Sequence, residues 1–255
     1  MIGSYLEFIR LLGTRTAELH LALAAPVEDP AFAPEPFTDF YRHGLYHGVV
    51  ARLSRTLDLL GRRLPGLPDT VRAEVERLLQ RQSAIRERYR TLRDQRIYAH
   101  RIRIHGDYHL GQALYTGRDF VIIDFEGDPA RPQSERRIKR SPLRDVAGML
   151  RSFHYATEAA LLGLGGSGSV RPEDRRVLEP WARFWQSWSS AAYLNSYLAT
   201  AAGASFLPDS REELSMLLEV HLLEKAVYEL GYELNNRPDW AGVPLQGILQ
   251  LIEAA

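Results

Sequence analysis

One short β-like segment, enclosed by long stretches of helical periodicity, constrains the fold most. Apolar residues recur at helical spacing before residue 101 and again after Pro142, which places them on one face of a helix. This pattern predicts helices over residues 5–25, about 40–60, 69–96, 143–162, 173–201, 209–236 and 244–254. Stretches rich in proline or glycine at 29–38, 65–68 and 163–168 predict irregular connections. We expect a mainly α fold with a small β-hairpin element, in the α+β class.

The β-like segment lies between Arg101 and Asp124. Ile102 and Ile104 alternate with arginines, residues 113–115 are short and apolar, and residues 120–123 are continuously apolar and mostly β-branched. Gly117 and Arg118 occupy the place of a turn between the last two runs. The segment therefore predicts a hairpin.

Composition limits the classes of partner. The 32 basic and 32 acidic residues cancel to a formal net charge of zero, so no overall field attracts nucleic acid or an anionic membrane. The chain has no cysteine, which excludes disulfides and thiolate chemistry and agrees with a reducing compartment. No apolar run reaches the roughly 18–20 residues that cross a bilayer. We expect a cytoplasmic protein without membrane or nucleic-acid partners.

Two polar motifs flank the predicted hairpin. The segment His105-Gly106-Asp107-Tyr108-His109-Leu110-Gly111-Gln112 precedes it, and Ile122-Ile123-Asp124-Phe125-Glu126-Gly127 ends it. In kinase chemistry, an aspartate on a loop accepts the proton of the attacking hydroxyl. Magnesium is held by a side-chain amide five residues later and by a second aspartate that follows a hairpin. Asp107 is the predicted base, and Gln112 and Asp124 are the predicted ligands of magnesium and ATP phosphate.

Other residues near these motifs allow more than one interpretation. Glu126 shares the face of Asp124 if the strand continues, so it is a further candidate metal ligand or a solvated glutamate. His105, Asp107 and His109 could instead form a hydrolase metal site, although His105 is more often structural in such loops. Asp145 is expected in the first turn of a helix, where it could also brace the catalytic loop. Trp181, Trp185 and Trp188 favour helix packing over a carbohydrate platform.

The two motifs resemble those of the aminoglycoside phosphotransferase-like kinases, and the glutamine in the first is similar to the maltokinases. Three further stretches, residues 11–24, 139–153 and 225–240, strengthen this resemblance. It implies the C-terminal lobe of a protein-kinase-like fold, with a helical part at 1–100, the catalytic loop and metal-binding hairpin at 101–128, and a helical substrate-binding part at 141–255. The N-terminal lobe of such kinases is not recognisable upstream of Leu11.

The resemblance also implies a function. It predicts transfer of the ATP γ-phosphate to maltose, giving maltose 1-phosphate for α-glucan synthesis, with Mg²⁺ as cofactor and trehalose synthase as a possible partner. The predicted substrate-binding residues combine aromatic, carboxylate and guanidinium groups; they are His109, Tyr228, Glu229, Tyr232 and Arg237. The alternative for the last four is an ordinary amphipathic helix with salt bridges.

Two other functions remain open from the sequence. The same chemistry could act on another sugar, such as glucosamine or glucose. The chain could also be a catalytically incomplete fragment that binds saccharide or docks a partner. An assay of several sugars with ATP separates the first alternative, and binding of saccharide without turnover identifies the second.

Overall fold

A computed structural model describes residues 2–25, 28–67, 69–163 and 170–253. The chain forms two compact units, each built from two separate stretches of sequence. Unit 1 comprises Met1–Pro36 and Tyr98–Asp209, and unit 2 comprises Phe37–Ile97 and Ser210–Ala255. Most of the loop predicted at 163–168 lies outside the described residues. The three-part division by role stays a prediction.

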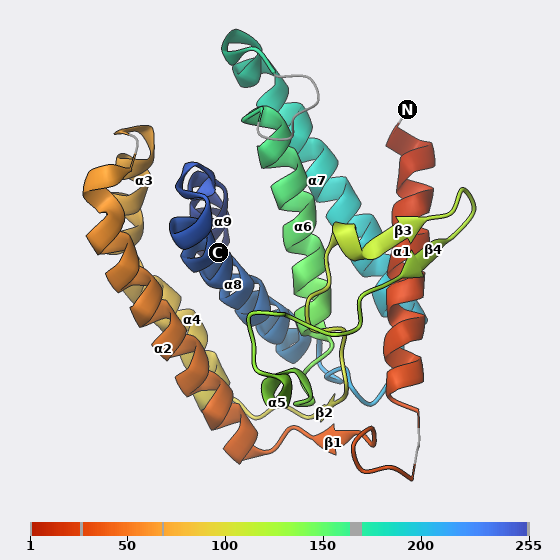
Figure 1. The fold of residues 1–255 in the computed structure, drawn as a ribbon. Helices are drawn as coiled ribbons and strands as arrows, with labels where there is room; N and C mark the ends of the chain where they lie inside the picture. The colour runs from red at the N-terminus through yellow and green to blue at the C-terminus, as the bar shows by residue number, and fades with distance from the viewer. Residues whose placement is uncertain (1, 26–27, 68, 164–169, 254–255) are drawn as a thin grey trace. The chain divides into compact units, whose positions relative to one another are not determined.

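The helices of unit 1 are α1 (Ile2–Leu23), α5 (Gln133–Arg136), α6 (Leu143–Leu161) and α7 (Pro172–Thr200). Helix α7 packs against both α1 and α6 (Figure 1). The approach of α1 to α7 is close at Gly13, where any side chain would collide with the carbonyl oxygen of Tyr193. One residue later, the hydroxyls of Thr14 and Ser196 are hydrogen-bonded at 2.9 Å. Helix α1 is therefore held firmly on α7.

Unit 1 also contains two small antiparallel sheets. Strand β3 (Ala113–Tyr115) pairs with β4 (Phe120–Ile122) in the predicted hairpin, and the Thr116 amide closes its turn on the Asp119 carbonyl at 2.8 Å. Strand β1 (Glu35–Pro36) pairs with β2 (His100–Arg101). The prediction of a wholly irregular 29–38 was wrong at β1, because this pairing joins residues far apart in the sequence, beyond the reach of a local pattern.

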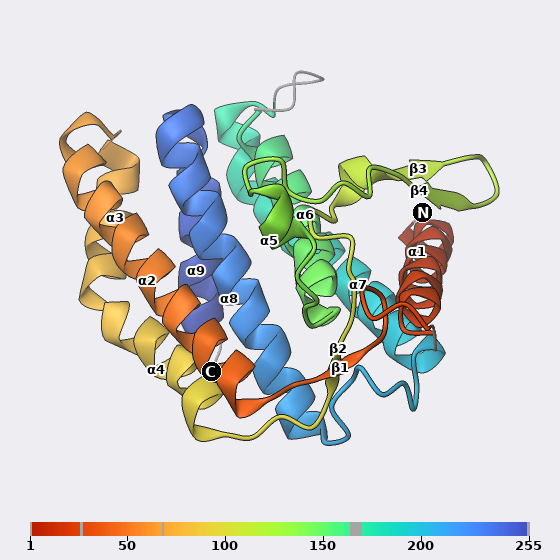
Figure 2. The same ribbon diagram turned by 60° about the horizontal axis from the view of Figure 1, so that its bottom comes forward.

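The helices of unit 2 are α2 (Asp39–Arg63), α3 (Asp69–Gln80), α4 (Gln82–Asp94), α8 (Arg211–Asn236) and α9 (Gly242–Glu253), with short 3₁₀ turns η1 (Leu64–Gly66) and η3 (Pro238–Trp240). Helix α8 packs on α2, α4 and α9, while α3 packs on α9 (Figure 2). The hydroxyls of Thr38 and Ser210 cap α2 and α8 by accepting from backbone N–H groups.

The single helix predicted over 69–96 was wrong, because the chain breaks at Arg81 into α3 and α4. Val75 and Leu78 are buried in α3, and Ile85 is the next buried apolar residue, in α4. The intervening Gln80-Arg81-Gln82-Ser83 is polar and exposed throughout, and α3 packs on α9 whereas α4 packs on α2 and α8. The break lets each half bury its own apolar face. Helices α1, α2, α6, α7, α8 and α9 match their predicted ranges to within a few residues, whereas the short helix α5 was not predicted.

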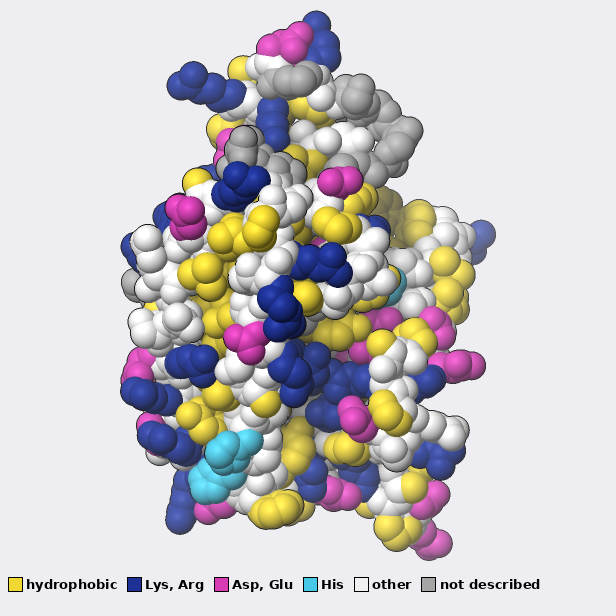
Figure 3. Space-filling model, turned by 60° about the vertical axis from the view of Figure 1, so that its left-hand side comes forward, with side chains coloured by type: hydrophobic (Ala, Val, Ile, Leu, Met, Phe, Trp, Pro, Cys, Tyr) yellow, Lys and Arg dark blue, Asp and Glu magenta, His cyan; other side chains and the backbone are white. Residues whose placement is uncertain are grey.

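The surface carries both signs of charge. Lys and Arg side chains lie among Asp and Glu side chains on the face shown in Figure 3, in accord with the zero formal net charge of the chain. Among the described helices, none has a stretch long and apolar enough to cross a bilayer.

Candidate active site

The root of the β3–β4 hairpin brings two of the predicted site residues into contact. Ala113 pairs with Ile122 in the ladder, so the residues just outside this pair lie next to each other. The side-chain amide of Gln112 donates to the Asp124 carboxylate at 2.9 Å, and the Ile123 amide donates to the Gln112 carbonyl at 3.0 Å. Predicting these two residues as neighbours was correct.

Asp124 has a backbone conformation that side chains seldom adopt. Its φ is +63°, the one positive φ of a non-glycine residue in the described part of the chain. Such a conformation costs on the order of 1 kcal/mol, and it ends the strand and turns the chain at the carboxylate. Glu126 lies in the following turn and is exposed. The premise that Glu126 shares the face of Asp124 along a continuing strand was therefore wrong, because β4 ends at Ile122.

His105 joins the catalytic loop to the strand end that precedes Asp124. Its ring is buried, and Nε2 lies 2.8 Å from the Ile123 carbonyl oxygen. A carbonyl can only accept, so Nε2 carries the hydrogen, which leaves Nδ1 to accept from the Asp107 amide at 3.4 Å. The ring also lies 5.2 Å and 5.3 Å from the rings of Tyr108 and Phe125. The structural interpretation of His105 is confirmed.

Asp145 braces the start of the predicted catalytic loop from the first turn of α6. Its carboxylate accepts from the His105 amide at 2.7 Å and the Gly106 amide at 2.9 Å, and His20 Nε2 lies 3.2 Å away. Burial of Asp145 disfavours the charged form, but the hydrogen bond from His20 and that from the Gly106 amide outweigh it, so the pKa is lowered. The anion is thus stabilised where it holds two loop amides.

Helix α6 supports the rest of the loop at two points. The Ser152 hydroxyl accepts from the Leu110 amide at 3.0 Å. A Cβ at Gly148 would lie 2.5 Å from the Tyr108 carbonyl oxygen, so only glycine lets the loop backbone approach this closely. His20, Gly148 and Ser152 were not predicted as site residues. They lie on helices distant in sequence, and nothing in the local pattern distinguishes them from packing residues.

His109 is engaged within its own turn. Its Nδ1 accepts from the Gly111 amide at 3.0 Å and caps the 3₁₀ turn η2 (Leu110–Gln112). The substrate-binding role of His109 stays a prediction.

The four predicted sugar-binding residues on α8 and at its C-terminal end belong to unit 2. The Arg237 guanidinium binds the buried Glu233 carboxylate, with Nε at 2.9 Å, and lies 4.6 Å from the centre of the Trp240 ring. The charged groups of Arg52 and Lys225 each lie 5.3 Å from the centre of the Tyr228 ring. These contacts show a packing role for Arg237 and a cationic surrounding for Tyr228. Sugar binding by Tyr228, Glu229, Tyr232 and Arg237 stays a prediction.

The three tryptophans of α7 were predicted to serve helix packing, and Trp185 confirms this prediction. Trp185 packs on Tyr5 and Phe153, with ring centres 5.5 Å and 6.1 Å apart. Trp181 and Trp188 are 68% and 52% exposed, so the prediction was wrong for these two. They lie seven residues apart, close to two helical turns, and so share the outer face of α7.

The donor chemistry at the hairpin root fits magnesium. Asp124 offers two carboxylate oxygens, and the Gln112 amide, beside them, carries one oxygen. These hard oxygen donors are the kind that Mg²⁺ prefers, and Mg²⁺ usually takes only one or two carboxylates and leaves other positions to phosphate and water. Among the described residues, no group of three or more His, Asp or Glu side chains could hold a metal. Convergence of Asp107 on the same ion stays a prediction.

Comparison with solved structures places this fold among kinases that act on sugars. The chain superposes on a glucosamine kinase with a TM-score of 0.76 and 25% identity, covering 97% of this chain and 54% of that one. A glucosamine kinase in complex with glucosamine, ADP and inorganic phosphate gives a TM-score of 0.73 with 26% identity, over 98% of this chain and 53% of that one. The fold is thus mostly helical and kinase-like. That it is a C-terminal lobe stays a prediction.

The relatives found by sequence comparison are glucosamine kinases as well. The glucosamine kinase of Streptacidiphilus jiangxiensis is 29% identical over 243 residues, which cover 94% of this chain and 48% of the relative. The glucosamine kinase of Mycolicibacterium smegmatis (strain ATCC 700084 / mc(2)155) is 44% identical over 57 residues, covering 22% of this chain and 14% of the relative. No family model matches the chain. The chain spans about half the length of the first of these relatives.

The resemblance to maltokinases was therefore wrong in its choice of kinase. The relatives that cover nearly the whole chain are glucosamine kinases, and nothing in these comparisons supports maltose or trehalose synthase as a partner. The error has a chemical reason. The two motifs around the hairpin were predicted to serve phosphate transfer, whose chemistry is the same for any sugar hydroxyl, so they do not distinguish one acceptor from another.

Proposed function

We propose that this chain carries the catalytic loop and the acceptor-binding residues of an ATP-dependent glucosamine kinase. The observation that carries the proposal is the contact of 2.9 Å between Gln112 and Asp124, beside a loop that presents Asp107. Similarity over 94% of the chain to a glucosamine kinase supports glucosamine as the acceptor. The finding of ADP and phosphate with one structural relative supports ATP as the phosphate donor.

In this proposal each site residue has a separate role in phosphoryl transfer. A hydroxyl oxygen of glucosamine forms a bond to the γ-phosphorus while the bond from that phosphorus to the ADP oxygen breaks. Asp107 accepts the proton of the attacking hydroxyl, and Asp145 and His105 hold the loop that orients it. Magnesium, held by Asp124 and Gln112, would neutralise charge on the phosphate oxygens.

Selection of glucosamine as the acceptor requires a side chain that binds its amino group. The amine distinguishes glucosamine from glucose and is a cation when protonated, so a carboxylate is its natural partner. Glu229 lies on α8, one turn before Glu233, and is the carboxylate among the predicted sugar-binding residues, so we assign it to the amine.

The test is an acceptor assay of the purified chain with magnesium and ATP. Glucosamine, glucose and maltose are supplied separately, and ADP release is measured beside a control without sugar. We expect turnover with glucosamine well above the other two sugars. Greater turnover with maltose or glucose would refute glucosamine as the acceptor.

Calorimetry with glucosamine, run in parallel, distinguishes a binding module from an enzyme. Binding of glucosamine without ADP release would favour a noncatalytic saccharide-binding function. Absence of both binding and turnover would contradict the proposal altogether.

A further inference from the structure

The β3–β4 hairpin is too small to hold its own shape. Each strand has three residues, and an isolated two-stranded hairpin is at best marginally stable in water. Gln112 and Asp124 lie at its two ends, so their separation depends on how well the hairpin is held. The support must come from a neighbouring element.

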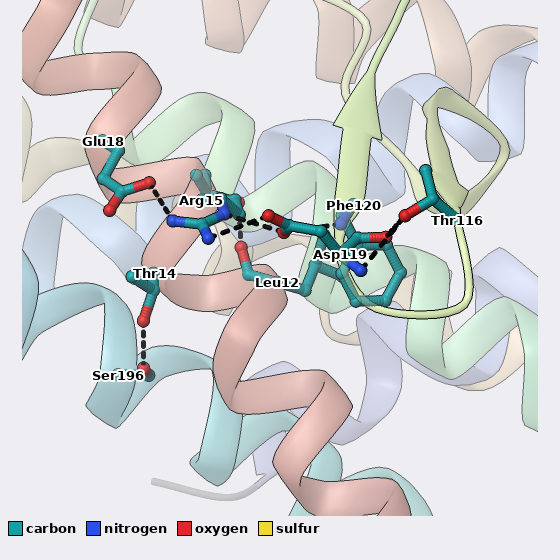
Figure 4. A network of polar contacts seen from close by, with 9 residues as sticks. Leu12, Thr14, Arg15, Glu18, Thr116, Asp119, Phe120 and Ser196 are labelled. Atoms are coloured by element: carbon teal, nitrogen blue, oxygen red, sulfur yellow. Dashed lines mark hydrogen bonds and ion pairs between the residues drawn. The ribbon is translucent and has the colours of Figure 1, made fainter.

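That element is α1, which lies beside the hairpin in both ribbon views (Figures 1 and 2). The Arg15 guanidinium faces the Asp119 carboxylate at the tip, with Nε–Oδ1 and Nη2–Oδ2 distances of 2.8 Å and 2.9 Å (Figure 4). Two parallel hydrogen bonds fix the angle as well as the distance between the groups. Arg15 and Asp119 are 104 residues apart in the sequence.

The tip itself is rigid enough to transmit this contact. Asp119 Oδ1 also accepts from the Phe120 amide at 2.7 Å, and the Thr116 hydroxyl bonds to the Asp119 carbonyl at 3.1 Å. A second contact runs beside it, where the Phe8 and Tyr115 ring centres lie 5.0 Å apart. The hydrogen bond from Arg15 lowers the pKa of the Asp119 carboxyl, so the pair stays charged at neutral pH.

We propose that Arg15 and Asp119 are positioning residues for the nucleotide: their ion pair fastens the hairpin tip to α1 and so fixes Gln112 against Asp124 at the root. The proposal rests on the proposed function, because it takes Gln112 and Asp124 as the residues that hold magnesium and phosphate. Neither residue of the pair touches substrate in this scheme.

Amide hydrogen exchange on the whole chain tests, without relying on activity, whether the Arg15–Asp119 ion pair holds the hairpin root. The Ile123 amide reports the root, because it donates to the Gln112 carbonyl, and the Ile102 amide, which donates to the Arg140 carbonyl, is an internal reference in the same unit. We expect Arg15→Gln and Asp119→Asn each to speed exchange at Ile123 about threefold, the scale of an exposed ion pair. Exchange at Ile102 should not change.

The variants are chosen to isolate the pair. Asparagine at 119 keeps an oxygen for the Phe120 amide, removes the charge and replaces the oxygen that accepts from Arg15 Nη2 with an NH2 group. Glu18→Gln is the matched control, because Glu18 binds Arg15 Nη1 at 2.6 Å without touching the hairpin. The double variant R15Q/D119N should exchange at Ile123 no faster than either single variant, because both substitutions remove the same Arg15–Asp119 ion pair. Arg15→Lys, which keeps the charge, should recover part of the protection.

Steady-state kinetics give the functional readout. We expect R15Q and D119N to raise the KM for magnesium–ATP about threefold, with the KM for glucosamine unchanged. Unchanged exchange at Ile123 in both variants would overturn the proposal that the Arg15–Asp119 ion pair fixes the root. If the chain phosphorylates no sugar, the proposed function fails, and the exchange experiment still decides whether Arg15 and Asp119 hold the root.

Discussion

At the scale of single residues, the proposed kinase gives Asp107 the most specific chemical role, that of the base. It lies on a loop whose preceding backbone amides are held by Asp145, so its side chain can be changed without removing that support. Asp107→Asn should lower turnover of glucosamine by roughly 100- to 10,000-fold, because asparagine cannot accept the proton.

Binding of glucosamine by the D107N variant should stay near that of the unaltered chain, as measured by calorimetry. Asp94→Asn serves as the control, since Asp94 is an exposed aspartate paired with Arg93. Turnover by D107N within a fewfold of the unaltered chain would remove Asp107 from the role of base.

His154 sets a different residue-scale expectation, for stability against pH. It is 2% exposed, and in the described structure neither ring nitrogen has a hydrogen-bond partner. Burial, with a smaller contribution from the Arg151 charge, lowers the pKa of His154 from 6.5 to about 2. Below pH 6.5, His154 is therefore protonated in the unfolded chain but stays neutral in the folded chain. The free energy of unfolding consequently falls as the pH drops from 6.5, by at most about 1.4 kcal/mol per pH unit.

Urea unfolding at pH 7.5 and pH 5.5 measures this loss. His154→Leu should flatten the dependence between these two values, since leucine cannot take up the proton. The lowered pKa of Asp145 acts in a more acidic window, below the ordinary carboxyl pKa of about 4, and does not contribute there. If the free energy of unfolding depended on pH equally in H154L and in the unaltered chain, His154 would not be the origin of the loss.

At the scale of elements, the approach of the catalytic loop to α6 depends on Gly148. Gly148→Ala places a Cβ about 2.5 Å from the Tyr108 carbonyl oxygen, and the resulting overpacking should destabilise the chain by about 1–3 kcal/mol. Gly48→Ala in α2 is the matched control, because nothing lies within 4 Å of a Cβ there. That control should be neutral or stabilising by up to about 1 kcal/mol. Urea midpoints of the two variants decide the matter, and equal midpoints would contradict the close approach.

The elements that could be predicted are those with a local cause. Six of the seven predicted helical ranges follow from a repeating apolar face, and the β3–β4 hairpin follows from two short apolar runs around Gly117. The break at Arg81 could not be predicted, since neither proline nor glycine marks it and only the packing of α3 on α9 and α4 on α8 explains it. The β1–β2 pair joins Glu35 to Arg101, a contact with no signal in either local sequence.

The same distinction holds for the candidate site. Gln112 and Asp124 could be paired from the sequence because a short hairpin connects them, which makes their contact a local event. The residues that hold the loop and hairpin in place could not: His20 and Arg15 come from α1, and Ser152 from α6. Their side chains reach the site only after the helices of unit 1 have packed.

At the scale of the whole molecule, the candidate residues divide between the two units. Asp107, Gln112 and Asp124 belong to unit 1, whereas the predicted sugar-binding residues at 228–237 belong to unit 2. Each unit is assembled from two stretches of chain, so this division could not be predicted from the order of the motifs. In the proposed kinase, phosphate-side and acceptor-side binding should therefore respond to separate substitutions.

Paired substitutions test this separation. Asp124→Asn should raise the KM for magnesium–ATP on the order of tenfold to hundredfold and leave the KM for glucosamine unchanged, because each charged contact contributes about 1.5–3 kcal/mol. Glu229→Gln should do the reverse, since it removes the charge of the carboxylate assigned to the amine. Glu212→Gln, an exposed glutamate in the first turn of the same helix, should change neither value. If E229Q weakened binding of magnesium–ATP as much as that of glucosamine, the assignment of acceptor recognition to α8 would be wrong.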